Sequence, residues 1–79
     1  MEILIKNGFL KDDDYYIKKD LKKGFEYHLE LNNQSLEIYK YFIDENEEFI
    51  FDRYSDNLIY RGFITCEEDL IKILNYYEI

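Results

Sequence analysis

Residues 25–31 show the clearest pattern of hydrophobic and polar positions in the chain, because apolar and polar side chains alternate there without a break. Alternation with a period of two places successive side chains on opposite faces of a β-strand. One face of this expected strand takes Phe25, Tyr27, Leu29 and Leu31. The other face takes Glu26, His28 and Glu30, and we expect it to be an ordinary solvated face.

Three further β-rich runs follow this strand, and polar turns separate them. The four strands are expected to start near residues 25, 36, 48 and 58, about 10 to 12 residues apart. This spacing is typical of an antiparallel meander in which consecutive strands form hairpins. The later runs are residues 36–43, 48–53 and 58–64, and the turns are residues 32–35, 44–47 and 55–57.

Lys40 interrupts the face that Leu36, Ile38 and Phe42 would otherwise share in the second strand of this series. A β-bulge would explain the interruption, and so would a strand whose two faces are both partly covered. The sequence leaves both explanations open.

The C-terminal residues have helical periodicity instead. Thr65 and Glu68 have the spacing of a capping box, in which each side chain bonds a backbone N–H at the start of a helix. One apolar stripe follows at helical spacing and is expected to face the sheet. The stripe consists of Cys66, Leu70, Ile73, Leu74 and Tyr77.

Residues 1–6 are expected to form a short strand with Ile3 and Ile5 on one face, and Asn7-Gly8 is expected to turn the chain after it. Residues 12–23 begin with three aspartates and end with Lys22-Lys23 before Gly24. Acidic residues at the start of a segment, basic residues at its end and a glycine just after it are typical of a helix. This pattern favours a short helix near residues 13–23. The competing interpretation is a strand over residues 15–21 that turns at Lys23-Gly24.

These elements predict an α+β fold, an antiparallel β-meander of four to five strands packed by a C-terminal helix. The chain has no proline and no linker-like stretch, so residues 1–79 are expected to form a single acidic domain. The apolar run at the N-terminus is too short for a signal peptide or a membrane span. The single cysteine, Cys66, cannot form an internal disulfide, which favours the cytoplasm of the host cell.

Charge narrows the possible partners. Ten Lys and Arg stand against 18 Asp and Glu, a formal net charge of −8. Such a chain repels phosphate backbones and anionic lipid surfaces, so direct binding of nucleic acid or membrane is disfavoured. Residues 24–79 hold 13 of the acidic residues and only four basic ones, so the acidity belongs to the strand-rich part.

No arrangement of residues indicates catalysis, a metal or a cofactor. His28 with Glu26 and Glu30 could in principle hold a metal, but a solvated strand face is the favoured interpretation. Cys66 is expected to be a core residue rather than a nucleophile. A calcium loop counted from Asp12 would need glycine and glutamate where Ile17 and Lys23 stand. The chain is therefore not expected to be an enzyme.

What remains is a surface rich in carboxylates and tyrosines. Tyrosine provides a large contact area at low entropic cost and is enriched in binding hot spots, although codon bias in an AT-rich genome would also explain nine tyrosines. Alternate carboxylates on strands repeat at about 6.5 to 7 Å, comparable to successive phosphates of a nucleic-acid backbone. The candidate partner-binding residues are Glu26, Glu30, Glu37, Tyr39, Tyr41, Asp44, Glu45, Glu47, Glu48, Asp52, Tyr54 and Asp56.

Small size, strong acidity and many aromatic residues resemble phage-encoded anti-defence proteins, including anti-CRISPR inhibitors and DNA mimics. The resemblance implies an inhibitor that binds a basic protein such as a nuclease. The first alternative is an immunity protein or antitoxin that neutralises a cationic toxin. The second is a non-catalytic homo-oligomeric accessory protein that associates through its sheet edge or tyrosines.

Overall fold

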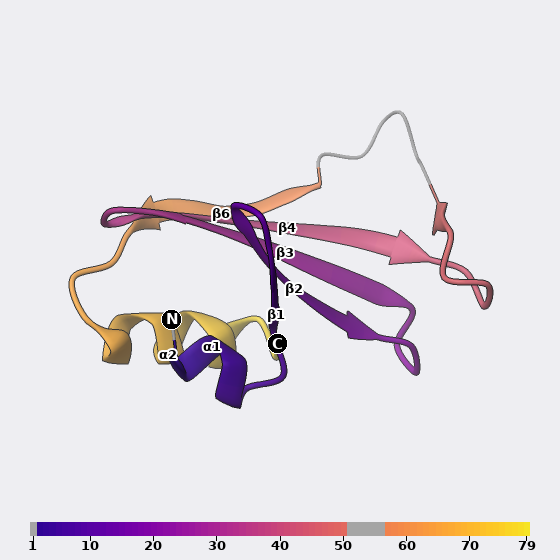
Figure 1. Ribbon diagram of the computed structural model, residues 1–79, viewed down its shortest axis with the longest axis horizontal. Helices are drawn as coiled ribbons and strands as arrows, with labels where there is room; N and C mark the ends of the chain where they lie inside the picture. Colours follow the sequence, from indigo (N-terminus) through magenta and orange to yellow (C-terminus); the bar gives the residue numbers. More distant parts are fainter. Residues whose placement is uncertain (1, 51–56) are drawn as a thin grey trace.

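Strand pairing organises the molecule, and both helices lie on one face of the resulting sheet (Figure 1). A computed structural model describes residues 2–50 and 57–79, and six antiparallel strands lie within them. The α+β class, the antiparallel sheet and the C-terminal helix are confirmed. The elements are α1 (Glu2–Lys6), β1 (Leu10–Asp12), β2 (Tyr15–Asp20), β3 (Phe25–Asn32), β4 (Ser35–Ile43), β5 (Phe49–Ile50), β6 (Leu58–Phe63) and α2 (Glu67–Tyr76).

The strand order departs from a simple meander at its end. Strands β1 to β5 pair in sequence order, but β6 pairs with β4 instead of β5. This is possible because β4 is nine residues long and β5 uses only its last two, Phe42 and Ile43. The first half of β4, from Ser35 to Tyr39, is therefore free to pair with β6.

The core lies between the sheet and the helices. Leu29 of β3 is paired with Ile38 of β4, and both side chains are fully buried. They pack in one cluster with Leu4 of α1 and with Leu70 and Leu74 of α2. This agrees with the predicted apolar face of β3 and with most of the predicted stripe of the C-terminal helix. In the described part of the chain, no helix is long and apolar enough to cross a membrane.

The N-terminal residues form helix α1, so the strand predicted for residues 1–6 is wrong. Gly8 has a φ of 91° and ends the helix in a Schellman motif. Its N–H donates to the Ile5 carbonyl at 3.1 Å, and the Phe9 N–H donates to the Leu4 carbonyl at 3.0 Å. Leu4 and Phe9 are both buried in the core, which is the hydrophobic contact that accompanies this cap. Asn7-Gly8 is therefore a helix end and not a hairpin turn.

The helix predicted near residues 13–23 is also wrong, and the competing strand is what the structure contains. Asp13 adopts a φ of 52° in a two-residue turn between β1 and β2. Strand β2 then pairs along its whole length with β3, which buries Tyr16 opposite Leu29. Acidic and basic residues at the two ends suit a helix dipole, but they suit two hairpin turns equally well. Pairing with β3 decides between the two, because it buries Tyr16 in the core.

Lys40 lies beside an irregularity, as its place in the pattern suggested. The pairing of β4 with β6 shifts register between Ile38 and Tyr39, so an irregularity of the sheet lies close to Lys40. Lys40 stays on the inner face opposite Tyr27, and its ammonium lies 3.8 Å from the centre of the Phe25 ring. A cation–π contact therefore accommodates this charge beside the aromatic side chains of the inner face.

The start of α2 differs from the expected capping box. Cys66 is the N-cap, its side chain is exposed, and it makes no cap hydrogen bond, so the expectation of a core cysteine is wrong. Asp69, not Glu68, reaches back: its Oδ2 accepts hydrogen bonds from the Thr65 N–H at 3.1 Å and the Thr65 hydroxyl at 2.8 Å. These bonds lower the pKa of the Asp69 carboxyl. The helix begins one residue later than predicted, which moves Cys66 out of the buried stripe.

Leu29→Ala is expected to cost about 2–5 kcal/mol of folding stability, because it leaves a cavity at a fully buried position of the sheet. Urea unfolding followed by circular dichroism measures this loss. Leu10→Ala removes the same atoms from a side chain that is 73% exposed and should change stability little. Equal losses of folding stability in the two variants would contradict the assignment of Leu29 to the core and of Leu10 to the surface.

Asp69→Ala is expected to lower the midpoint of thermal unfolding at pH 7, whereas Glu68→Ala in the same helical turn should change it less. The folded-state pKa of Asp69 is lowered, so its stabilising effect is present above the ordinary pKa of 3.8. The effect is lost as the pH falls through the lowered value. The difference between wild type and Asp69→Ala should therefore shrink in acid, and a difference that grew in acid would refute the assignment.

Candidate functional site

The sheet has an outer face, which we define as the face opposite the helices. In residues 2–50 and 57–79 neither helix covers it (Figure 1). The cross-strand register places Lys19 of β2, Glu26 of β3 and Tyr41 of β4 side by side across this face. One step along the strands, Ile17, His28 and Tyr39 form the next row. Side chains from three strands therefore meet on a surface that has no second layer.

An aromatic cluster occupies the middle of the outer face. The His28 ring lies 4.7 Å from Tyr41, 6.0 Å from Tyr15 and 6.2 Å from Phe49, measured between ring centres. Tyr41 also contacts Phe49 at 5.4 Å and is stacked with Tyr39 at 6.4 Å. Tyr39 and Tyr41 were predicted as partner-binding residues, and the structure places them next to each other. Tyr15 and Phe49 were missed, because only strand register brings them to His28.

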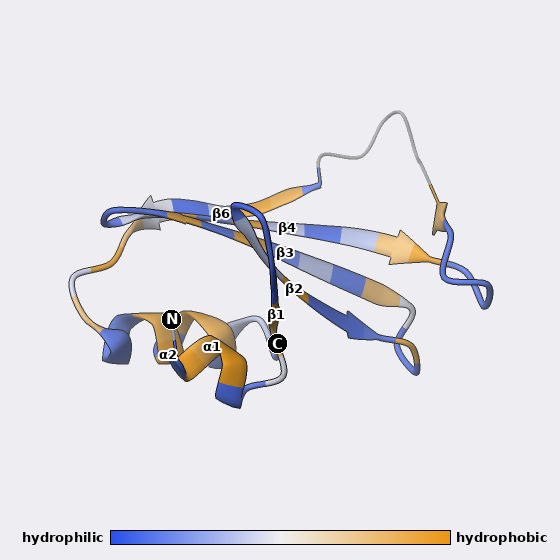
Figure 2. Cartoon of the chain, viewed as in Figure 1, coloured by the Kyte–Doolittle hydropathy of each residue, from blue (hydrophilic) through white to orange (hydrophobic). Residues whose placement is uncertain are grey.

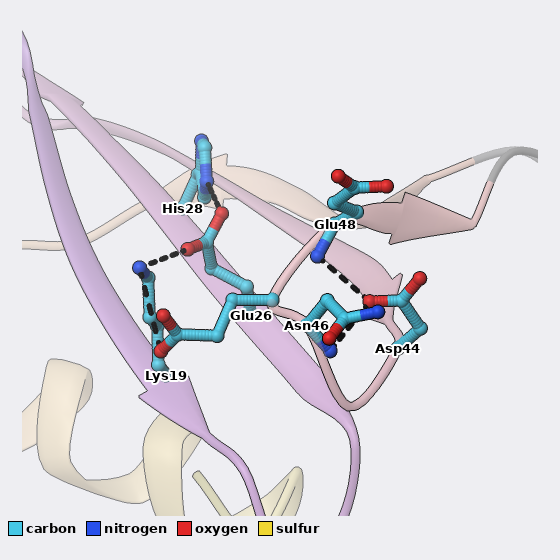
Figure 3. A network of polar contacts seen from close by, with 7 residues as sticks. Lys19, Glu26, His28, Asp44, Asn46 and Glu48 are labelled. Carbon is cyan, nitrogen blue, oxygen red and sulfur yellow. Dashed lines mark hydrogen bonds and ion pairs between the residues drawn. The ribbon is translucent and has the colours of Figure 1, made fainter.

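Glu26 is almost enclosed, which corrects the expectation that its strand face is solvated. Only 6% of the residue is exposed. His28 Nε2 lies 2.8 Å from Glu26 Oε2, and Lys19 Nζ lies 3.7 Å from Glu26 Oε1 (Figure 3). The same ammonium is 4.0 Å from Glu47 Oε1. Directly opposed Lys19 and Tyr41 flank Glu26 on both sides, so its carboxylate is held by partners instead of by water.

Glu37 is engaged in a similar way farther along the sheet. The Tyr39 hydroxyl donates a hydrogen bond to Glu37 Oε2, and Arg61 Nε lies 3.4 Å from Glu37 Oε1. The bond to the carboxylate, with burial, raises the pKa of Tyr39 to about 12. The pKa of Tyr41 is raised mainly by burial, with Tyr15 and Glu26 adding to the effect. Half-buried Glu30 lies directly opposite Glu37 on the neighbouring strand.

The turn between β4 and β5 carries the exposed carboxylates. Asp44 holds this turn: its Oδ1 accepts the Asn46 N–H at 2.9 Å and the Glu48 N–H at 3.0 Å (Figure 3). Its backbone N–H also donates to the Glu48 carbonyl at 2.8 Å. The side chains of Glu45, Glu47 and Glu48 are exposed and take no part in these bonds. Of the predicted residues in this turn, Asp44 is therefore structural, Glu45 and Glu48 are exposed, and Glu47 is exposed with one oxygen 4.0 Å from the Lys19 ammonium.

Apolar side chains flank this turn on both sides of the sheet. Phe42 of β4 and its partner Ile50 of β5 are 47% and 56% exposed on the inner face, beyond the reach of the helices (Figure 1). Phe49 is 41% exposed and contributes to the cluster on the outer face. Figure 2 shows the hydrophobic ends of β4 and β5 with the hydrophilic turn between them. We call residues 42–50 the sheet tip.

The structure thus brings Glu26, Tyr41 and the turn glutamates to one end of the sheet, while Glu30, Glu37 and Tyr39 lie farther along the strands. The remaining predicted residues, Asp52, Tyr54 and Asp56, lie outside the described residues. Within the described residues, no three His, Cys, Asp or Glu side chains gather in a way that could hold a metal ion.

Comparison with known proteins finds no matching family model, no similar curated protein and no similar solved structure.

Glu37→Gln is expected to bring the pKa of Tyr39 down from about 12 toward its ordinary value of 10, because it removes the charged acceptor. NMR titration of the tyrosine ring carbons measures this change. The folded pKa is the raised one, so the stability from this bond is complete below pH 10 and is lost as the pH rises toward 12. Glu30→Gln, which removes a weaker and more distant charge, should lower the pKa less. A larger effect of Glu30→Gln would contradict the assigned bond.

Proposed function

We propose that this chain is a small acidic inhibitor whose sheet tip binds the basic surface of a nucleic-acid-handling protein. One observation carries the proposal: three exposed glutamates, free of the bonds that hold their turn, lie between exposed apolar side chains on both faces of the sheet. Charge and apolar area together are what a protein-binding site needs.

Charge complementarity selects the partner class. Glu45, Glu47 and Glu48 follow one another in a short turn, and the chain as a whole carries a net charge of −8. A cluster of one sign attracts surfaces of the opposite sign and speeds association with them. The basic grooves that bind nucleic-acid backbones are surfaces of this kind. Their lysines and arginines would be drawn to the turn.

The apolar part of the tip supplies the short-range energy. Phe42, Phe49 and Ile50 are each between 41% and 56% exposed and lie within one hairpin. Burial of aromatic and aliphatic side chains at the centre of an interface dominates most binding energies. The glutamates would form the polar rim around this centre, where they contribute more to association rate than to affinity.

The carboxylates on the strands, unlike those in the turn, are not proposed to attract the partner. Glu26 is paired with Lys19 and His28, and Glu37 with Tyr39 and Arg61. Paired carboxylates do not present a free row of negative charges. The proposal therefore rests on the turn and not on a phosphate-like array along the strands. Inhibition requires only that the tip and the nucleic acid compete for the same basic residues.

Reversal of the turn charge is expected to slow association with the partner by about tenfold or more at low ionic strength. The variant is Glu45→Lys, Glu47→Lys and Glu48→Lys, which leaves Asp44 in place to hold the turn. Wild-type and variant proteins are immobilised and used to capture proteins from nuclease-treated host lysate. The captured proteins are identified by mass spectrometry, and their association rates are measured with purified material.

A matched control applies the same change in charge elsewhere: Glu2→Lys, Asp14→Lys and Glu68→Lys, all exposed and distant from the tip in the fold. Basic nucleic-acid-binding proteins should be retained by the wild type and the control, lost by the tip variant, and released by excess duplex DNA. Equal capture by the tip variant, or partners that DNA does not displace, would overturn the proposal.

A further inference from the structure

A hollow of about 630 Å³ opens on the outer face beside the sheet tip. Its wall is formed by β1 and β2 on one side and by β3 and the β4–β5 hairpin on the other. Three carboxylates, two lysines, one histidine and three apolar side chains line it. They are Asp12, Glu26, Glu47, Lys11, Lys19, His28, Leu10, Ile17 and Phe49.

The Lys19 ammonium sits between two of the carboxylates but is not tightly bound to either. Its Nζ lies 3.7 Å from Glu26 Oε1 (Figure 3). It lies 4.0 Å from Glu47 Oε1, and both distances are longer than a direct hydrogen bond. The Lys19 side chain is 46% exposed, so it can leave for solvent without crossing protein. An ion pair of this length, with one partner half exposed, holds its ammonium less tightly than a direct hydrogen bond would. Lys19 is therefore a displaceable occupant of this position.

Glu26 is, by contrast, held firmly in place. His28 Nε2 binds its Oε2 at 2.8 Å, and the Tyr41, Tyr15 and Phe49 rings fix the imidazole. This fixes the carboxylate with its other oxygen, Oε1, 3.7 Å from the Lys19 ammonium, which in turn lies 4.0 Å from Glu47 Oε1. His28 is thus a positioning residue for an enclosed carboxylate that a second cation could reach.

We propose that this hollow takes an arginine side chain of the bound protein, which displaces the Lys19 ammonium; the assignment rests on the proposed function. A planar guanidinium has five donors and can bind Glu26 and Glu47 together, whereas an ammonium acts as a point charge. It also stacks on aromatic rings, and Phe49 and His28 line the same hollow. Arginines are abundant in surfaces that bind phosphate, so the occupant matches the partner class.

The test is an NMR titration of the isolated, isotope-labelled chain with N-acetyl-arginine-N-methylamide, compared with the corresponding lysine amide. The arginine probe should give saturable shifts confined to Lys19, Glu26, His28 and Phe49. The lysine probe should bind about fivefold or more weakly, because its ammonium is a compact point charge without the planar array of five donors and the stacking surface of a guanidinium. Shifts spread evenly over the exposed acids of α2 and of the β1–β2 turn, or equal binding of the two probes, would overturn the proposal.

Two variants examine the position of Lys19 and Glu26. Lys19→Met removes the resident cation and should strengthen arginine binding several-fold, an effect that damage to the fold would not produce. Glu26→Gln should weaken binding about tenfold, whereas Glu30→Gln, on the same face of the same strand, should leave it unchanged. Unchanged or weaker binding by Lys19→Met would overturn the proposal, including in the case where Glu26→Gln does not fold.

The arginine site can fail while the proposed function stands, and the two failures are distinguishable. Glu45→Lys with Glu48→Lys alters the turn but leaves the lining of the hollow intact. If the double variant loses partner capture and the wild type does not bind the arginine probe, only the proposed arginine site is refuted. If the wild type binds the arginine probe and the double variant still captures the partner, the proposed function is refuted and the arginine site is supported.

Discussion

The fold depends on how little helix is available to cover the sheet. Helix α1 has five residues and α2 has ten, and both must pack on the same face for Leu4, Phe9, Leu70 and Leu74 to meet Leu29 and Ile38. A chain of 79 residues buries only one core. In the described residues, no helix is left for the other face or for the far end of β3 and β4. The outer face and the sheet tip are both consequences of this shortage.

An uncovered face must satisfy its own polar groups. Glu26 is 6% exposed, and an enclosed carboxylate is tolerable only with hydrogen-bonding and charged partners. The structure supplies His28 and Lys19, and the aromatic rings around His28 exclude water from the pair. Glu37 is satisfied in the same manner by Tyr39 and Arg61. Exposed carboxylates remain in the β4–β5 turn, where they lie next to exposed apolar side chains.

The sequence predicts elements well where local periodicity and burial agree. The alternation of residues 25–31 predicts β3 and its buried face, and the stripe through Leu70 and Leu74 predicts α2. Predictions failed where one local signal suits two structures. Asn7-Gly8 suits a hairpin turn as well as the end of a helix, and only the burial of Leu4 with Phe9 decides between them.

Long-range pairing accounts for the other differences. Pairing with β3 turns residues 15–20 into a strand, and the length of β4 lets it pair with both β5 and β6. In the candidate site, too, local sequence predicts some features and long-range pairing determines the others. Composition suggests a surface of tyrosines and acids, but only register brings Tyr15 and Phe49 to His28. Nor could spacing in the sequence distinguish structural Asp44 from its exposed neighbours, because its role depends on hydrogen bonds within the turn.

The sheet tip combines two features that oppose each other in the free protein and cooperate in the proposed complex. Exposed Phe42, Phe49 and Ile50 at the end of a sheet invite association with other chains. Like charges on the turn between them repel a second copy and keep the tip hydrated. A basic partner neutralises those charges and covers the apolar side chains in the same step. Because the tip projects beyond the helix-covered core, its residues can serve binding at little cost to the packing of Leu29 and Ile38.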